Sequence, residues 1–175
     1  LLLHHRPDLD IGLLRGTVNT RIAALQDGQF DAIILAVAGL RRLGLDVDYA
    51  PLDLAVMPSS AGQGALAIQT RDRDDPRSLA VMAASADLGC AKTTTEVTAE
   101  RALLGRLDGS CHTPIAASAT CDENGRLHLD GMILSEDGRQ AFRDRIDGFG
   151  SDATQLGEAL ADQLLVAAGG RHFLP

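Results

Sequence analysis

The pattern of apolar and polar residues predicts two different parts that meet near residue 76. In the first part, residues 10–15 form a short run typical of a β-strand. Residues 32–37 are a continuous apolar run, which is typical of a strand buried on both faces of a parallel sheet. Residues 64–70 alternate between apolar and polar positions and also favour a strand. We therefore expect three strands before residue 71.

Helices are expected after the first two of these strands. Thr17 is placed to cap a helix that ends near Asp27, with Gly28 as its stop. A short helix is expected over residues 38–43, ended by Gly44. The order strand, helix, strand, helix predicts an α/β layer for this part of the chain.

From residue 76 onward the pattern predicts an α+β domain. Helical runs occupy residues 77–88, 93–107 and 152–168, the last one capped by Asp152. Strand-like runs occupy residues 115–121, 126–134 and 140–147. The dipeptides Asn124-Gly125 and Asp137-Gly138 separate these runs and are typical of hairpin turns. We therefore expect a three-stranded antiparallel sheet with helices packed on it.

Composition and charge narrow the classes of function. Apolar residues make up 45% of the 175 residues, which is enough for a packed core. The formal net charge of −8 argues against nucleic-acid binding, because neutralising phosphates needs clustered Lys and Arg. An anionic small molecule stays compatible with this charge if a few arginines converge locally. No apolar run reaches 18 residues, so we expect no membrane span.

The cysteines and histidines lack the spacing of metal ligands. The cysteines are Cys90, Cys111 and Cys121, which form no Cys-x-x-Cys pair and are odd in number. This pattern argues against a disulfide framework and against a metal site, and it favours a reducing compartment, so we expect a cytoplasmic protein. His112 follows Cys111 directly, and adjacent side chains seldom point the same way, so we do not assign His112 as the general base of a Cys–His pair.

Cys111 lies in the run Leu107–Pro114, with the sequence LDGSCHTP, between a predicted helix and a predicted strand. A thiol on a loop held by two rigid elements can carry a covalent group, and a thiolate is a good nucleophile. The alternative is that Cys111 is a small buried apolar residue, which is the more common fate of a lone cysteine. The spacing alone leaves both interpretations open.

Arginines gather near a predicted strand-to-helix turn. Arg15 and Arg21 flank Gly16, where the start of a helix favours anions. Arg42 is a third member of a candidate anion-binding cluster, and Arg41 lies beside it in sequence. The guanidinium group matches carboxylates with two parallel donors. The alternative interpretation is that these arginines are ordinary solvated side chains.

The segment Gly62-Gln63-Gly64 is expected to form a tight, exposed turn, in which two glycines let the backbone approach a ligand. It is a weak candidate for a phosphate loop, because no complete Gly-x-Gly-x-x-Gly or P-loop pattern surrounds it. The alternative is an ordinary turn or hinge.

Four segments together resemble the porphobilinogen deaminase (hydroxymethylbilane synthase) family. Their order and spacing agree with the family, and the resemblance covers nearly the whole chain. The segments are residues 14–21, 31–44, 62–65 and 98–115. The chain resembles the C-terminal half of a family protein, or slightly more.

The resemblance implies an enzyme of tetrapyrrole and haem biosynthesis. It implies that Cys111 forms a thioether to a dipyrromethane cofactor, with Arg15 and Arg21 binding that cofactor. It implies that Arg15, Arg21 and Arg42 bind the acetate and propionate groups of porphobilinogen and the growing polypyrrole, and that Gln63 is a further substrate contact. The reaction implied is the condensation of four porphobilinogen molecules into hydroxymethylbilane with release of ammonia.

The resemblance also implies how the chain is divided. Residues 1–61 correspond to a partial α/β domain of periplasmic-binding-protein type, the family's second domain without its front. Residues 62–75 correspond to a crossing segment toward the first domain, and residues 76–175 to the C-terminal domain with the cofactor cysteine. The family's catalytic aspartate precedes Leu1, so we identify no catalytic residue in this chain. Family members are usually monomeric, and this chain is expected to need the N-terminal domain for activity.

Two other functions remain compatible with parts of the pattern. A non-catalytic α/β ligand-binding module of periplasmic-binding type accounts for residues 10–70 but not for the Cys111 loop. A thiol hydrolase that uses Cys111 accounts for the loop but lacks a convincing general base.

Overall fold

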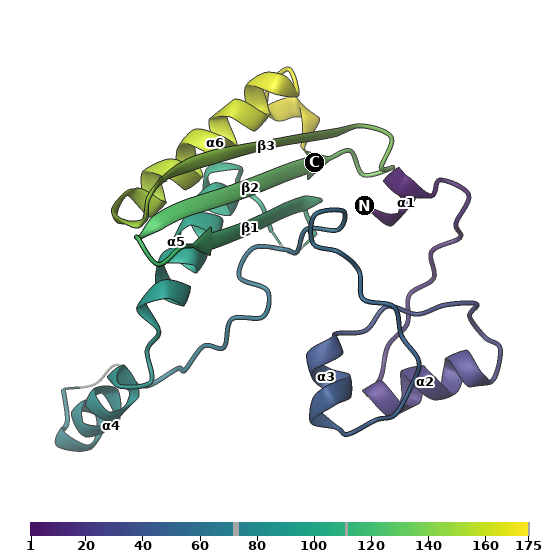
Figure 1. Ribbon diagram of the computed structural model, residues 1–175, viewed down its shortest axis with the longest axis horizontal. Coiled ribbons are helices and arrows are strands. Elements are labelled where there is room, and N and C mark those ends of the chain that lie inside the picture. The colour runs from purple at the N-terminus through teal and green to yellow at the C-terminus, as the bar shows by residue number, and fades with distance from the viewer. Residues whose placement is uncertain (72–73, 111, 175) are drawn as a thin grey trace. The chain divides into compact units, whose positions relative to one another are not determined.

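The computed structural model describes residues 1–71, 74–110 and 112–174. The chain forms two compact units (Figure 1), a smaller unit of residues 8–56 and a larger unit of residues 1–7 and 57–175. The compact units therefore divide near residues 7 and 56, whereas the family-domain boundaries at 61 and 75 stay a prediction.

A three-stranded antiparallel sheet in the order β1-β2-β3 lies at the centre of the larger unit (Figure 1). The strands are β1 (Ile115–Cys121), β2 (Arg126–Leu134) and β3 (Ala141–Phe149). Gly125 and Gly138 have φ angles of 76° and 71° in the two hairpin turns, a conformation that favours glycine. The predicted α+β fold is confirmed here, with β1 and β2 at the predicted bounds.

One face of this sheet packs against α5 (Ala91–Arg106) and α6 (Ala153–Ala167). Every second residue of β1 from Ile115 to Cys121 joins the main apolar core, and core residues recur every three or four positions along both helices. The largest fully buried side chains are Leu103, Leu107, Leu127, Leu129, Ile133, Leu160 and Leu164.

Two glycines allow these layers to approach closely. A Cβ at Gly157 of α6 would lie 2.3 Å from the carbonyl oxygen of Ala99 on α5. A Cβ at Gly131 of β2 would lie 2.7 Å from Leu103 Cδ1. The contacts at Gly157 include backbone atoms, so this glycine limits how closely α6 and α5 approach, whereas the contacts at Gly131 are the ends of leucine side chains that can shift.

The opposite face of the sheet carries the N-terminal segment and several polar pairs. Leu1, just before α1 (Leu2–His5), packs against a small buried cluster of Ala116, Met132 and Leu134. The His4 ring Nδ1 lies 2.9 Å from the carbonyl oxygen of Gly138. Arg143 donates to Asp130 through Nε (2.8 Å) and Nη2 (3.0 Å), a two-donor pair across β2 and β3.

Helix α4 (Pro76–Ala86) confirms the prediction at 77–88. Asp75 caps it, because Asp75 Oδ1 accepts from the N–H groups of Arg77 (3.1 Å) and Ser78 (3.0 Å). Pro76 occupies the first turn, where its missing N–H is not needed.

Asp152 precedes α6 as predicted, but it does not cap the helix with its side chain. Asp152 ends a 3-10 turn, η1 (Gly150–Asp152), and has φ −104° and ψ 19°. This conformation differs from the extended one that aims an N-cap side chain at the first helical amides. A second 3-10 turn, η2 (Arg171–Phe173), follows Gly169 and Gly170.

The smaller unit contains α2 (Val18–Gln26) and α3 (Val37–Arg42), which confirm the two predicted helices. Thr17 Oγ1 accepts from the N–H of Thr20 at 3.3 Å, so the predicted cap is present. The unit is small, and its buried apolar residues are Ala24 and Leu40.

The strands predicted at residues 10–15, 32–37 and 64–70 are wrong, because none of these segments forms a strand and Val37 already belongs to α3. Their apolar side chains are largely in solvent, with Leu13 79% and Ile34 54% exposed. A strand needs a neighbour that pairs with its N–H and C=O groups, and these segments have no such neighbour among the described residues. The predicted α/β layer is therefore not formed in the smaller unit.

Candidate functional site

The loop that contains Cys111 connects α5 to β1 in the larger unit. Cys111 itself lies outside the described residues, so the structure does not test its role. Its flanks form a closed turn: the Ser110 N–H donates to Thr113 Oγ1 (3.0 Å) and the Thr113 N–H donates to the Ser110 carbonyl (3.1 Å). The backbone N–H of His112 donates to Ser110 Oγ (3.2 Å). This bond does not involve the His112 ring, so the expectation that the ring has no role stays a prediction.

Both ends of this loop are joined to the core. At its start, the Gly109 N–H donates to the Leu104 carbonyl (2.9 Å), and a Cβ at Gly109 would lie 2.5 Å from Leu104 Cδ1. At its end, the Leu134 N–H of β2 donates to the Pro114 carbonyl (3.0 Å). Glycine at position 109 therefore lets the loop leave the helix directly over its last turn.

Arg171 of η2 binds the segment where α5 ends. Its Nη2 lies 2.5 Å from Asp108 Oδ2, and its guanidinium donates to the carbonyls of Arg106 and Leu107, each at 3.4 Å. Asp108 has φ 55°, which is uncommon for a residue other than glycine. A cation at a helix C-terminus also interacts favourably with the unpaired carbonyls there.

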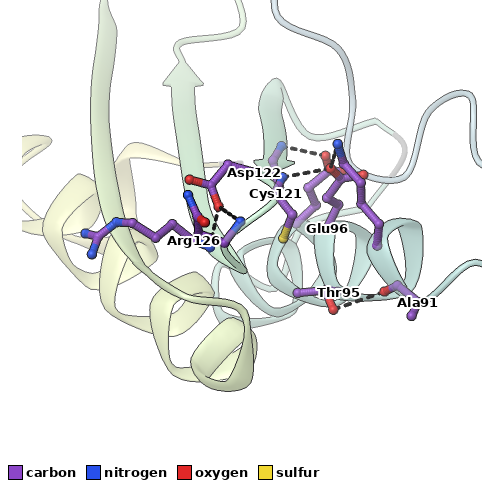
Figure 2. Close-up of polar contacts among 10 residues, drawn as sticks. Ala91, Thr95, Glu96, Cys121, Asp122 and Arg126 are labelled. Atoms are coloured by element: carbon purple, nitrogen blue, oxygen red, sulfur yellow. Dashed lines mark hydrogen bonds and ion pairs between the residues drawn. The ribbon is translucent and has the colours of Figure 1, made fainter.

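The free edge of β1 is covered by hydrogen-bond acceptors. Along this edge the Ala119 N–H donates to Glu100 Oε1 (2.7 Å), and the Cys121 N–H donates to Glu96 Oε1 (2.8 Å). Figure 2 shows Glu96 reaching from α5 to the backbone at Cys121. The Ala117 N–H donates to the carbonyl of Ser59 (2.9 Å). These amides therefore have partners although β1 is an edge strand.

The Gly62-Gln63-Gly64 turn is present as predicted, with φ angles of 72° at Gly62 and 89° at Gly64. The Gly62 N–H donates to Glu100 Oε2 at 2.6 Å, which joins the turn to α5. Gln63 is exposed, and its Oε1 accepts from the Ser60 N–H at 3.2 Å. The role of Gln63 as a ligand contact stays a prediction.

The predicted arginine cluster lies in the smaller unit. Arg21 Nε donates to the Gly16 carbonyl at 2.9 Å, so Arg21 folds back over the turn that it was predicted to flank. Arg15, Arg41 and Arg42 are exposed, and the last two lie in the final turn of α3. The binding roles of Arg15, Arg21 and Arg42 stay predictions.

Glu96 and Glu100 were not singled out from the sequence. They lie four residues apart on α5, and Glu100 sits between the buried residues Ala99 and Leu103. A carboxylate beside an apolar helix face was the available signal, because a buried charge needs a partner. Arg171 gave no such signal, since it follows two glycines near the end of the sequence.

Burial raises the pKa of the Glu100 carboxyl. The hydrogen bonds from Gly62 and Ala119 act in the opposite direction, and the nearby charge of Glu96 raises the pKa further. Glu100 is only 8% exposed, so its desolvation outweighs the two hydrogen bonds.

The raised pKa predicts how Glu100 affects stability as the pH changes. The stability that a group with a raised pKa contributes is present below its ordinary pKa and is lost as the pH rises through the raised value. We therefore expect the free energy of unfolding of the wild type, measured relative to Glu100→Gln, to fall as the pH rises from the ordinary glutamate pKa through the raised one. The glutamine variant also lacks one acceptor oxygen, which adds a difference that does not depend on pH. Urea titrations of both proteins from pH 4 to pH 8 measure this difference, and a difference independent of pH would contradict the raised pKa.

The described residues contain no group of three or more His, Cys, Asp or Glu that could hold a metal ion. Among the described helices, none is long and apolar enough to cross a membrane.

Comparisons with known proteins match both parts of the chain. A family model described as "Porphobilinogen deaminase, dipyromethane cofactor binding domain" matches residues 1–78, and one described as "Porphobilinogen deaminase, C-terminal domain" matches residues 94–166. A porphobilinogen deaminase from Trichlorobacter lovleyi is 48% identical over 174 residues, which are 99% of this chain and 54% of the relative. Those from Pelobacter propionicus and Brevibacillus brevis are 47% and 41% identical, over 99% and 97% of this chain and 54% and 53% of the relatives.

The chain is homologous to a transferase. It belongs to the porphobilinogen deaminase family, since both family models and the curated relatives agree along nearly its whole length. The chain spans about half the length of the curated relatives it matches.

Proposed function

We propose that this chain is the part of a hydroxymethylbilane synthase that carries the covalent cofactor. The reaction condenses four porphobilinogen molecules into linear hydroxymethylbilane and releases ammonia. The observation that carries this proposal is the match of the C-terminal family model to residues 94–166, which include the Gly-Ser-Cys-His-Thr-Pro loop. The match of the cofactor-binding family model to residues 1–78 supports it.

The proposed cofactor is a dipyrromethane joined to Cys111 by a thioether. The flanks of the loop fit such a group, because Ser110 and His112 are exposed, whereas the core residues Leu107 and Ile115 are buried beyond them. When bound, the cofactor supplies the pyrrole carbon from which the chain grows, and the covalent link keeps intermediates from diffusing away.

We propose that residues of this chain bind the anionic groups of the ligand. Arg15, Arg21 and Arg42 bind the carboxylates of the cofactor and of the growing polypyrrole, each through charge-assisted hydrogen bonds. Gln63 is proposed as an uncharged contact from the glycine turn. The exposure of Arg15 and Arg42 supports this role, because their guanidinium groups are accessible to a ligand.

The test is to mix purified protein with porphobilinogen and to measure ammonia release and hydroxymethylbilane by mass spectrometry. Two samples are compared, the chain alone and the chain mixed with the unmatched half of the Trichlorobacter lovleyi relative. We expect turnover in the mixed sample. The proposal fails if neither sample releases ammonia and no sample carries a pyrrole adduct.

Arg15→Ala and Arg21→Ala are expected to weaken turnover and leave the fold intact. A hydrogen bond to a charged group contributes about 1.5–3 kcal/mol, so kcat/KM should fall roughly 10- to 150-fold in each variant. Circular dichroism should show wild-type helix content, because Arg15 is exposed and, within the described residues, the side chain of Arg21 bonds the carbonyl of Gly16 in its own turn. Arg77→Ala, on the exposed surface of α4, is the matched control. Wild-type kinetics in both variants would contradict the assignment.

A further inference from the structure

Within the larger unit, the turn that carries Gln63 is attached along the free edge of β1. The Ala117 N–H of β1 donates to the carbonyl of Ser59, three residues before Gly62. Pro58 is buried, and Ala61 packs against the main apolar core. The segment of residues 58–62 therefore runs beside β1 without forming a strand of its own.

Glu100 is the polar link in this attachment. Its Oε2 accepts from the Gly62 N–H at 2.6 Å, and its Oε1 accepts from the Ala119 N–H at 2.7 Å. One carboxylate thus bridges two backbone amides that are far apart in sequence, one in the turn and one in the edge strand. Both bonds are short, as expected for a charged acceptor, and Glu100 is buried.

Two further hydrogen bonds lie within the turn itself. The Gln63 N–H donates to the Ser60 carbonyl (3.0 Å), and the Ala65 N–H donates to the Gly62 carbonyl (3.3 Å). These bonds shape the turn internally but do not join it to the rest of the unit. Gly62, with φ 72°, keeps its N–H aimed at α5 in a conformation that other residues rarely adopt.

We propose that Glu100 is a positioning residue that holds the Gly62-Gln63-Gly64 turn at a set place beside β1, and with it the side chain of Gln63. This inference rests on the proposed function, because Gln63 is proposed there as a contact for a porphobilinogen-derived ligand. Glu100 acts through Gln63 and touches no reacting atom.

Glu96 provides a control of the same kind on the same helix. It accepts from the Cys121 N–H at 2.8 Å, and its side chain is 18% exposed, with Lys92 Nζ 4.0 Å away. Glu96 therefore supports the same edge strand (Figure 2), and among the described residues it makes no hydrogen bond to the turn. A variant at Glu96 should lose a similar bond to β1 without releasing residues 60–65.

The experiment is hydrogen–deuterium exchange on the full chain, for the wild type, Glu100→Leu, Glu100→Gln and Glu96→Leu. Leucine removes both acceptor oxygens at similar volume, and glutamine keeps one of them. In Glu100→Leu we expect exchange in residues 60–65 to rise at least roughly fivefold, with a smaller rise in Glu100→Gln. Residues 127–134 of the central strand should stay at wild-type rates, and Glu96→Leu should leave residues 60–65 unchanged.

Two results would overturn the proposal: unchanged exchange in residues 60–65 of both Glu100 variants, or an equal rise in every segment. If Glu100→Leu does not fold, Glu100→Gln alone decides, because it keeps the side-chain shape and changes one acceptor.

Turnover provides the second measurement, on the mixed sample described above. Glu100→Gln should raise KM for porphobilinogen more than it lowers kcat, whereas Glu96→Gln should change neither. Equal kinetics in the two variants would overturn the positioning role. Absence of turnover in the wild type would count against the proposed function, while the exchange measurement would still decide whether Glu100 holds the turn.

Discussion

Replacing Cys111 by serine is expected to abolish cofactor attachment and to reduce hydroxymethylbilane formation to background. The thioether needs a sulfur nucleophile, and a serine hydroxyl is not ionised near neutral pH and is a much weaker nucleophile. The intact mass of the denatured wild type should exceed the sequence mass by two porphobilinogen units less two molecules of ammonia. The Cys111→Ser protein should show the sequence mass alone.

Cys90→Ser is the matched control for this prediction. Cys90 is an exposed free thiol at the start of α5, so it tests whether any accessible cysteine takes up the pyrrole group. The Cys90→Ser protein should keep both the added mass and the turnover. An adduct that peptide mapping places on Cys90, or an adduct that persists in Cys111→Ser, would refute the assignment of the cofactor to Cys111.

Gly157→Ala is expected to destabilise the larger unit by roughly 2–3 kcal/mol, because the added methyl group meets backbone atoms that cannot rotate away. Its Cβ would lie 2.3 Å from Ala99 O and 2.9 Å from Leu103 N, so α6 would have to move away from α5. Such a movement would also open the core around Leu160 and Leu164, which are fully buried. Urea unfolding followed by circular dichroism at 222 nm measures the change.

Gly105→Ala tests whether this effect comes from packing or from helix propensity. Gly105 lies in the last turn of α5, and a Cβ there would have nothing within 4 Å. This variant should be neutral or more stable by up to about 1 kcal/mol, because alanine is a better helix former than glycine. A stable Gly157→Ala protein would mean that the two helices do not pack as closely as the structure shows.

Local signals predicted much of the larger unit. The dipeptides Asn124-Gly125 and Asp137-Gly138 lie in the two hairpin turns, where both glycines have positive φ, and β1 has the predicted bounds. The helix α5 also lies close to the predicted helical run at 93–107. These features depend on residues close in sequence, so the local sequence pattern was sufficient to predict them.

The strand predictions at 10–15 and 32–37 failed for a different reason. An apolar run shows that a segment favours an extended, buried state, but a strand forms only beside a partner. The described chain contains no partner for these segments, and Leu13 and Ile34 lie exposed. The apolar residues of these two segments therefore did not predict whether their backbones would pair with another strand.

The candidate site shows the same division. The sequence pointed to Cys111 and Gln63 through motifs and to Arg15, Arg21 and Arg42 through charge near a turn. It did not point to Glu100, whose role depends on Gly62, 38 residues away, and on Ala119, 19 residues away. A glutamate on a helix is usually solvated, and only the approach of two distant backbone segments buries this one.

The sequence by itself determined the helices and hairpins, because each depends on a continuous run of residues, and it determined the family through four motifs whose order and spacing agree. Only the tertiary structure decided that α5 supplies two carboxylates to the free edge of β1 and that one of them also holds the Gly62 turn. The physical reason is that a buried hydrogen bond is defined by two partners. The sequence names each partner, but the packing of α5 against the sheet brings them within 3 Å.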